Sequence, residues 1–152
     1  MILIDVNLLI YAVFSNSARH AGAREWLDHT LSGIEAVALP WAVLSAFVRL
    51  ATNPSVATQP LTVDDALAHV EEWLDLPVVR VIGPTGAHLV VFARMLRDTK
   101  AVGNLVPDAH LAAIAIEHGC RLASTDGDFA RFPDLDWFNP LGSAPPERAQ
   151  GN

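Results

Sequence analysis

The sequence predicts an α/β fold in which a parallel sheet is covered by helices on both faces. Three observations favour this class. The chain of 152 residues fits one domain with a sizeable core, 51% of its residues are apolar, and short apolar runs alternate with helical segments along its length. Strands separated by helices in this way pair in parallel, because each helix returns the chain to the same edge of the sheet.

Five short apolar runs are the expected strands. The first, ILI, is typical of a buried strand and ends at Asp5. The fourth, RLAS, follows a segment with the features of a helix that ends in glycine. In chain order, strands are expected at residues 2–4 (ILI), 36–40 (AVALP), 77–83 (PVVRVIG), 121–124 (RLAS) and 136–139 (DWFN).

The segments between these runs carry helix signals. Thr62 and Asp65 have the spacing of a capping box, and Pro107 occupies the first turn of a helix that ends at Gly119. Leucines 89 and 96, with Phe92 between them, predict one buried face on the fifth helix. Helices are expected at 7–14, 18–33, 41–53, 62–76, 85–98 and 107–119, with a helical turn at 128–132.

The chain is expected to form one domain over residues 1–141. No internal repeat interrupts it, and residues 142–152 (GSAPPERAQGN) have the composition of a disordered tail. The start MILIDVN has no basic segment and reaches Asp5 early, which excludes a signal peptide, and no apolar run has the length of a membrane span. Cys120 is the only cysteine, which favours a buried thiol in a reducing cytoplasm.

Charge and composition narrow the set of partners. The net charge of −7 argues against indiscriminate nucleic-acid binding, although a local basic rim remains compatible with it. The high apolar fraction indicates an exposed apolar patch and hence a partner. Six basic residues could form such a rim, and each is also typical of a solvated face: Arg19, Arg24, Arg49, Arg94, Arg97 and Lys100.

Four aspartates lie where strands end or where a helix begins. Asp5 follows the first strand, Asp126 and Asp128 follow the fourth, and Asp108 lies in the first turn of the helix that leads into the fourth. Ligands of parallel sheets bind beyond the carboxyl ends of the strands. If the first and fourth strands are neighbours, the four carboxylates converge there.

Converging carboxylates repel one another unless a cation holds them. A hard divalent ion is the simplest resolution, and Mg²⁺ or Mn²⁺ takes oxygen ligands, waters and substrate phosphates. Such an ion activates water and stabilises a reacting phosphate, so the pattern suits phosphodiester hydrolysis. Taken singly, each aspartate has another reading: Asp5 and Asp108 are also typical helix caps, and Asp126 and Asp128 can form an Asx-turn around Gly127.

The chain resembles PIN-domain ribonucleases, and specifically the VapC-type toxins of toxin–antitoxin pairs. The resemblance covers nearly everything except the tail, in the stretches MILIDVNLLIYA, LPWAVLSAFVRLATNP, GNLVPDAHLAAIAIEHG and LASTDGDFARFPDLDWFNPL. It implies a PIN-like domain with a five-stranded parallel sheet flanked by helices, Mg²⁺- or Mn²⁺-dependent RNA cleavage, a homodimer and a VapB-type antitoxin. It also implies metal ligands at Asp5, Asp108 and Asp126 and a supporting acid at Asp128.

One position departs from the family pattern. Where the family usually carries a second acid, a Glu three residues before an Arg, this chain has Ala46 ahead of Arg49. A methyl group cannot bind a metal ion, and Ser45 faces about 100° away on the helix. We interpret the loss as a reduced metal site, and it leaves the number of ions, one or two, open.

Other residues with functional chemistry have structural alternatives. His88, His110 and His118 lack zinc-site spacing and are expected at the surface or as caps. Asn104 could touch substrate, although a turn role suits the GN pair. The tryptophans could stack bases, but Trp41 and Trp73 fall at positions typical of a core.

Two rival functions belong to other classes. An aspartyl phosphatase would share Asp5 but needs an Asp-x-Asp pair, and here the sequence is DVN. A catalytically degenerate PIN domain that only binds RNA or an antitoxin is favoured by Ala46 and opposed by the four retained aspartates. As substrate, the resemblance favours structured RNA, with tRNA ahead of a ribosomal RNA loop.

Overall fold

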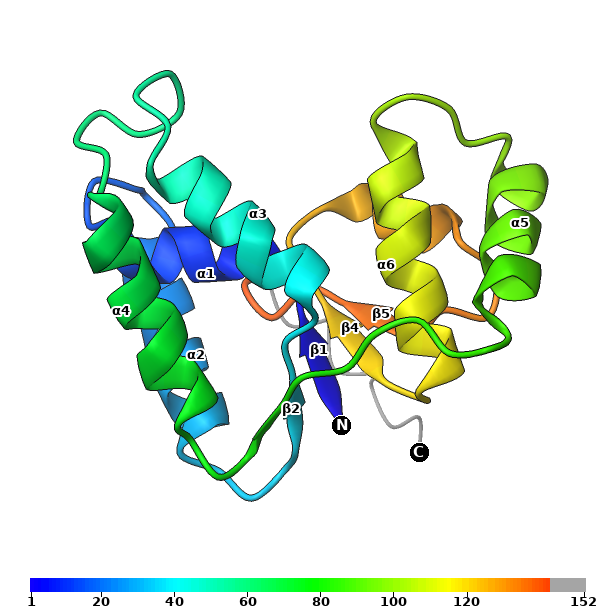
Figure 1. The fold of residues 1–152 in the computed structure, drawn as a ribbon, viewed down its shortest axis with the longest axis horizontal. Helices are drawn as coiled ribbons and strands as arrows, with labels where there is room; N and C mark the ends of the chain where they lie inside the picture. Colours follow the sequence, from blue (N-terminus) through cyan, green and yellow to red (C-terminus); the bar gives the residue numbers. More distant parts are fainter. Residues whose placement is uncertain (143–152) are drawn as a thin grey trace, which may run out of the picture.

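The computed structural model describes residues 1–142, and its sheet has five strands that are all parallel. Their order is β3-β2-β1-β4-β5 (Figure 1). The strands are β1 (Ile2–Ile4), β2 (Val37–Ala38), β3 (Val79–Arg80), β4 (Arg121–Ala123) and β5 (Trp137–Phe138). The predicted parallel sheet is confirmed, and β1 lies at its centre.

Four of the strands are shorter than expected, and β4 lacks only the last residue of its predicted run, 121–124. β2, β3 and β5 have two residues each, against predicted runs of 36–40, 77–83 and 136–139. Only these residues pair with a neighbouring strand, and the chain beyond them bends toward the next helix. A backbone hydrogen bond extends the pairing by one residue beyond β2: the Leu39 N–H donates to the carbonyl of Arg80, the last residue of β3, at 2.9 Å.

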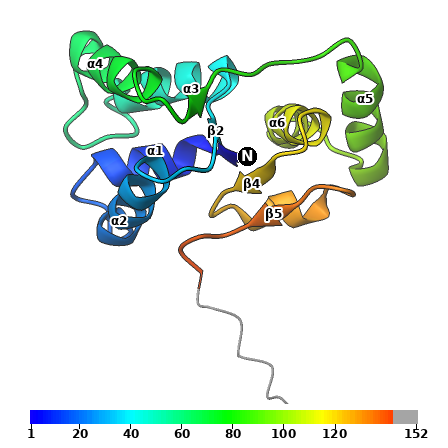
Figure 2. The same cartoon turned by 90° about the horizontal axis from the view of Figure 1, so that it is seen from below.

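Six helices connect and cover the strands. They are α1 (Val6–Val13), α2 (His20–Leu31), α3 (Trp41–Ala51), α4 (Val63–Leu74), α5 (His88–Thr99) and α6 (Leu105–Glu117). A 3₁₀ helix, η1 (Gly127–Arg131), follows β4. Helices α1 to α4 pack together on one side of β1, and α5 and α6 lie together on the other (Figures 1 and 2).

The helix ends follow the signals in the sequence with small shifts. The Thr62 hydroxyl accepts a hydrogen bond from the Asp65 N–H at 3.1 Å, so the predicted cap of α4 is confirmed. α6 begins at Leu105, two residues before Pro107, and Asp108 remains in its first turn. The predicted face of α5 is confirmed at Phe92 and Leu96, which pack against the core, whereas Leu89 in the first turn is exposed and Met95 is the fully buried residue.

The core lies around the central strands. All three residues of β1 are buried, as are Leu122 and Ala123 of β4, and Phe47, Ile114 and Phe129 pack into the same cluster. Trp73 is 6% exposed and meets Phe47 edge-on with ring centroids 4.8 Å apart, so its predicted packing role is confirmed. The buried Cys120 also agrees with expectation, and burial raises the pKa of its thiol.

Trp41 is an exception to the expected packing of tryptophans. It is 60% exposed, although its position had suggested a core side chain. The buried stripe of α3 passes through Val43, Leu44 and Phe47, and Trp41 lies beside that stripe in the first turn. An exposed indole therefore stands where α3 leaves the sheet.

Two sequence expectations concern the ends of the chain and membranes. The tail expected at 142–152 lies outside the described residues except for Gly142. Within residues 1–142, no helix is long and apolar enough to cross a membrane.

Candidate functional site

The ends of β1 and β4 bring the candidate acids to one edge of the sheet. The two strands pair directly, with Ile4 opposite Ala123, and the Asp5 N–H donates to the Ala123 carbonyl at 3.0 Å. The residues that follow each strand therefore start side by side. The predicted convergence of the carboxylates required β1 and β4 to be neighbours, and they are.

Asp5 is buried and fully engaged. It is 9% exposed, its Oδ1 accepts the Val6 N–H at 2.7 Å, and its Oδ2 accepts the Ser124 hydroxyl at 2.6 Å. Burial raises the pKa of Asp5, the two hydrogen bonds oppose that rise, and the negative charge of Asp126 adds to it. Asp5 also caps α1, so the capping interpretation holds together with any role in catalysis.

Ser124 connects the acids, and the sequence analysis did not single it out. It is 0% exposed and donates to Asp5, while its oxygen accepts the Asn7 Nδ2–H at 3.0 Å and the Asp126 N–H at 3.0 Å. One hydroxyl thus ties the end of β1 to the loop after β4. The signal that could have identified Ser124 in the sequence is its position as a polar residue directly after the apolar pair Leu122 and Ala123.

Asn7 is held by this hydroxyl on one side only. Its amide nitrogen donates to Ser124, whereas its buried Oδ1 has no hydrogen-bond partner within the described part of the chain. A buried acceptor without a partner carries a cost of about 1–3 kcal/mol. Such costs are typical of functional sites.

Asp126 and Asp128 form the turn that the sequence allowed. The Asp126 Oδ1 accepts the Asp128 N–H at 2.9 Å and caps η1. Asp128 is exposed and lies 3.8 Å from Arg131, a distance at which an exposed ion pair contributes little. The Asx-turn is therefore present, and it holds both carboxylates at the end of β4.

Asp108 differs from the other three because no hydrogen bond to its carboxylate is found within residues 1–142. The N-cap position of α6 belongs to Asn104, whose side chain makes no capping bond, so the capping interpretation of Asp108 is wrong. Burial, and after it the charges of Asp126, Asp5 and Asp128 in that order, raise the pKa of Asp108 to about 6. The four carboxylates thus act on one another through space.

The donor set suits a divalent cation. Burial and, after it, repulsion from the other acids raise the pKa of Asp108 to about 6, and positive charge at the same place would relieve both effects. Among residues 1–142, no three His, Cys, Asp or Glu side chains are gathered tightly enough to enclose an ion. Mg²⁺ keeps several waters and needs only one or two direct carboxylates, so an open set of acids fits it.

The departure from the family pattern lies on α3. Ala46 is half-buried there, next to the exposed Ser45, whose hydroxyl bonds to the Trp41 carbonyl at 2.6 Å. Ser45 is thus satisfied within its own helix and does not substitute for an acid.

Three of the six residues of the expected basic rim are engaged in other contacts. Arg24 pairs with Asp28 at 2.9 Å, Arg94 pairs with Asp134 at 3.0 Å, and Arg19 lies over the Tyr11 ring. Asn104 is exposed at the start of α6, close in sequence to Asp108. A role of these side chains toward substrate remains a hypothesis.

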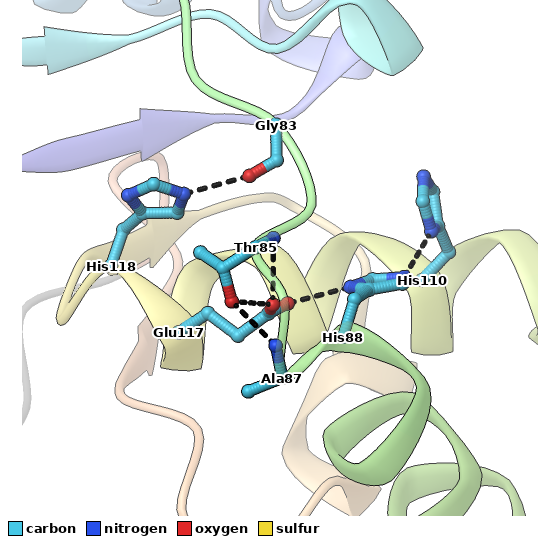
Figure 3. A network of polar contacts seen from close by, with 7 residues as sticks. All are labelled: Gly83, Thr85, Ala87, His88, His110, Glu117 and His118. Atoms are coloured by element: carbon cyan, nitrogen blue, oxygen red, sulfur yellow. Dashed lines mark hydrogen bonds and ion pairs between the residues drawn. The ribbon is translucent and has the colours of Figure 1, made fainter.

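Two of the histidines are not the surface or cap residues that we expected. The His88 Nδ1 lies 2.6 Å from the Glu117 carboxylate, and its Nε2 lies 2.9 Å from the His110 Nδ1 (Figure 3). Their spacing in sequence hid this, because α5 and α6 bring them together. His118 behaves as expected, since it caps α6, and its Nε2 contacts the Gly83 carbonyl at 2.7 Å.

Glu117 anchors this histidine pair. Its carboxylate accepts hydrogen bonds from the Thr85 N–H at 3.0 Å and the Thr85 hydroxyl at 2.6 Å, besides the contact with His88. Burial would raise the pKa of Glu117, but these hydrogen bonds lower it below its usual value. Glu117 is therefore ionised at neutral pH and fixes the ring of His88.

Comparison with known proteins identifies the class. The sequence matches the PIN domain family over residues 2–135, which together with the five-stranded parallel sheet makes this chain a PIN-domain protein. Ribonuclease VapC37 of Mycobacterium tuberculosis is 42% identical over 140 residues, covering 92% of this chain and 97% of the relative. Ribonuclease VapC33 of the same species is 38% identical, covering 93% and 99%.

Within the PIN domains, the chain belongs to the VapC family of ribonuclease toxins. Solved structures support the fold: FitAcB from Neisseria gonorrhoeae has a TM-score of 0.66 at 24% identity, covering 92% of this chain and 98% of the other. VapBC2 from Rickettsia felis, solved on a promoter DNA fragment, has a TM-score of 0.66 at 17% identity, covering 91% and 98%. The resemblance inferred from the sequence is confirmed.

Proposed function

We propose that this chain is a metal-dependent endoribonuclease toxin that hydrolyses phosphodiester bonds in structured RNA. The observation that carries the proposal is the meeting of the acids at one edge of the sheet, where Ser124 ties Asp5 to the backbone of Asp126 and α6 begins with Asp108 in its first turn. The raised pKa of Asp108, caused by burial and then by the charges of the other acids, agrees with this placement. Four carboxylates that repel one another at the carboxyl edge of a parallel sheet are what a phosphate-binding cation would neutralise.

Each residue has a role that follows from its surroundings. Asp5, Asp108 and Asp126 would hold Mg²⁺ or Mn²⁺, and Asp128 supports the charge of the group from the same turn. When bound, the ion supplies positive charge to the phosphate and lowers the pKa of water at the site. Ser124 holds Asp5 and the Asp126 backbone in place, so the acids are positioned before substrate arrives.

The substrate is proposed at two levels. The relatives VapC37 and VapC33 are named ribonucleases, which supports RNA as the substrate class. VapC20 of Mycobacterium tuberculosis, described as a sarcin–ricin-loop-cleaving toxin, shares the fold at a TM-score of 0.64 and 21% identity, covering 86% of this chain and 93% of the other. Between structured RNAs we favour tRNA, with a ribosomal RNA loop as the other candidate.

Metal removal gives the direct test of the activity. Purified chain, free of antitoxin, is expected to cleave total RNA at discrete sites with Mg²⁺ or Mn²⁺ and to lose this activity in EDTA, because the carboxylates then lack their counter-charge. Restoring the ion should restore the same fragments, which excludes a contaminating metal-independent nuclease. Intact RNA under all metal conditions, from protein shown to be folded, would contradict the proposal.

The alternative is a degenerate PIN domain that binds RNA or an antitoxin without cleaving. Ala46 favours it, because the family acid that usually stands there is missing. The burial and close ties of Asp5, Ser124 and Asp126 oppose it, because an unused site has no reason to keep buried charge at a cost. The same RNA assay separates the two, since the degenerate domain would bind RNA and leave it uncut.

The proposed partners are a VapB-type antitoxin and a second copy of the chain. Several similar structures are described as toxin–antitoxin complexes, among them one from Klebsiella pneumoniae, which supports the antitoxin. Exposed apolar side chains on α3, α4 and α5, including Trp41, Leu67 and Leu89, support further burial by association. We also propose that residues 1–141 form the PIN domain and that it acts in the cytoplasm.

The antitoxin is expected to neutralise the acids with a basic side chain. An Arg that reaches Asp5, Asp108 and Asp126 can bridge two carboxylates and take the place of the ion. Replacing that one partner residue with Ala should weaken inhibition, while Arg→Lys should weaken it less, as measured by RNA cleavage at fixed toxin. Sedimentation should show a homodimer at micromolar concentration, and a monomer, or full inhibition by a partner without basic residues near the site, would refute this account.

A further inference from the structure

A cavity lies between the start of α3, the segment that follows β3, and α6. It has a volume of about 530 Å³, and its lining includes Pro40, Trp41, Ser45, Ile82, Pro84 and His110. Cavities of this size, apolar with a few polar groups, are typical of small-ligand sites. None of the residues that line it is acidic, although the chain carries a net charge of −7. The lining itself therefore adds no negative charge that would oppose an RNA ligand.

The cavity adjoins the acids along two directions of the fold. Pro40 and Trp41 follow β2, which pairs directly with β1, so they lie one strand, about 4.8 Å, from the strand that ends at Asp5. His110 follows Asp108 by two residues on α6, so the two residues are about 3 Å apart along the helix axis but on different faces, about 200° apart around it, and α6 connects the cavity to the acids through its backbone. A nucleotide bonded to a phosphate at the acids can reach into this cavity.

Trp41 offers a face on which a base can stack. Its indole is 60% exposed, which leaves the ring free for a ligand, and α3 fixes the backbone that carries it. Unpaired RNA bases stack on aromatic side chains of this kind, and each such contact contributes about 1–3 kcal/mol.

His110 offers a hydrogen-bonding group whose orientation is fixed from behind. The ionised Glu117 accepts from the His88 Nδ1, and the His88 Nε2 meets the His110 Nδ1 at 2.9 Å. Figure 3 shows the other ring nitrogen of His110 pointing away from His88. Glu117 and His88 thus fix the orientation of the His110 imidazole. Its Nε2 remains available to a ligand in the cavity that His110 lines.

We propose that this cavity binds one unpaired base of the RNA next to the cleaved phosphate, with Trp41 stacking on the base and His110 Nε2 hydrogen-bonding to its edge. The proposal rests on the proposed ribonuclease function and deepens it, because these two residues would then determine which sequence is cut. A second copy of the chain could cover Trp41 instead, since the indole also borders an apolar groove between α3 and α4. The fixed imidazole favours the base, because an apolar contact gives its nitrogen no partner.

The test compares Trp41→Ala, Trp41→Phe and His110→Ala with a matched control, Ile34→Ala, which truncates an exposed apolar residue before β2. Cleavage sites in a tRNA pool are mapped by sequencing. Trp41→Ala is expected to raise KM about tenfold with little change in kcat, and Trp41→Phe to restore most of it. His110→Ala should broaden the choice of base beside the cut, and Ile34→Ala should change neither.

A binding measurement separates this inference from the activity itself. Binding of a short unstructured RNA is measured in EDTA by fluorescence anisotropy, so no cleavage is required, and the same loss for Trp41→Ala is expected. If the wild type does not cleave RNA but the binding difference remains, the ribonuclease function is refuted and the base site stands. Cleavage with unchanged sites, KM and binding in Trp41→Ala would refute the base site, and so would a shift from dimer to monomer as its only effect.

Discussion

Replacing Asp108 with Asn is expected to abolish RNA cleavage and, in the absence of metal, to stabilise the fold. Asparagine keeps the shape of the side chain but removes the charge that would hold an ion, and a loss of more than about a hundredfold in cleavage rate is expected. The stabilisation follows first from burial, which disfavours the charged carboxylate, and then from the other three acids, which repel that carboxylate and do not repel a neutral amide.

The size and pH dependence of that stabilisation follow from the raised pKa. A shift from 3.8 to about 6 corresponds to about 3 kcal/mol, but the side chain is partly exposed, and solvent screening reduces the expected gain to about 1 kcal/mol. Since the folded pKa lies above the unfolded value, Asp108 costs nothing below about pH 4, and its cost grows as the pH rises through 6. The gain in Asp108→Asn is therefore expected to be larger at pH 7 than at pH 5.

Urea denaturation in EDTA measures this gain, and Asp98→Asn is its matched control. Asp98 is exposed in the last turn of α5 and is not among the charges that act on Asp108, so the same chemical change there should alter stability by less than about 0.5 kcal/mol and leave cleavage intact. A destabilised Asp108→Asn, or one that cleaves RNA at the normal rate, would show that Asp108 is a structural residue only.

The sequence located the acids because their positions depend on strand ends. An aspartate directly after a buried strand of a parallel sheet must emerge at the carboxyl edge, and β1 and β4 are neighbours, so Asp5 and Asp126 meet there. Helix α6 enters at the same edge and brings Asp108. These placements need only strand order, which short-range patterns and the family resemblance supplied.

Other features depend on packing that local patterns do not encode. The burial of Ser124 between Asp5 and Asp126 depends on the two strands being in register. The contact between His88 and His110 depends on how α5 packs on α6. The same packing leaves Leu89 exposed in the first turn of α5. Trp41 was expected in the core because it begins an apolar helix. It is exposed because it lies in the first turn of α3, beside the buried stripe.

Replacing Ser124 with Ala should lower both stability and metal affinity. The change leaves the Asn7 amide and the Asp126 N–H, both half-buried, without their acceptor and removes the fully buried hydroxyl donor from Asp5. Each unpaired buried group costs about 1–3 kcal/mol, and because Asn7 and Asp126 can regain water in part, a total loss of about 3 kcal/mol is expected. Thr99→Ala, which removes a hydroxyl bonded within α5, should change stability by less than about 0.5 kcal/mol.

A stability loss alone would not distinguish a structural serine from one that positions the acids, so the metal dependence of cleavage decides. If the hydroxyl orients Asp5, Ser124→Ala should need about tenfold more Mg²⁺ for half-maximal cleavage, measured well below its melting temperature, because partners that orient a metal ligand typically carry effects of that size. Ser124→Thr restores the hydroxyl and should bring the Mg²⁺ requirement back toward that of the wild type, even if its extra methyl group keeps the fold less stable. An unchanged Mg²⁺ requirement in Ser124→Ala, despite the lost stability, would assign Ser124 to the packing of β1 against β4 and leave Asp5 to be oriented by the start of α1 alone.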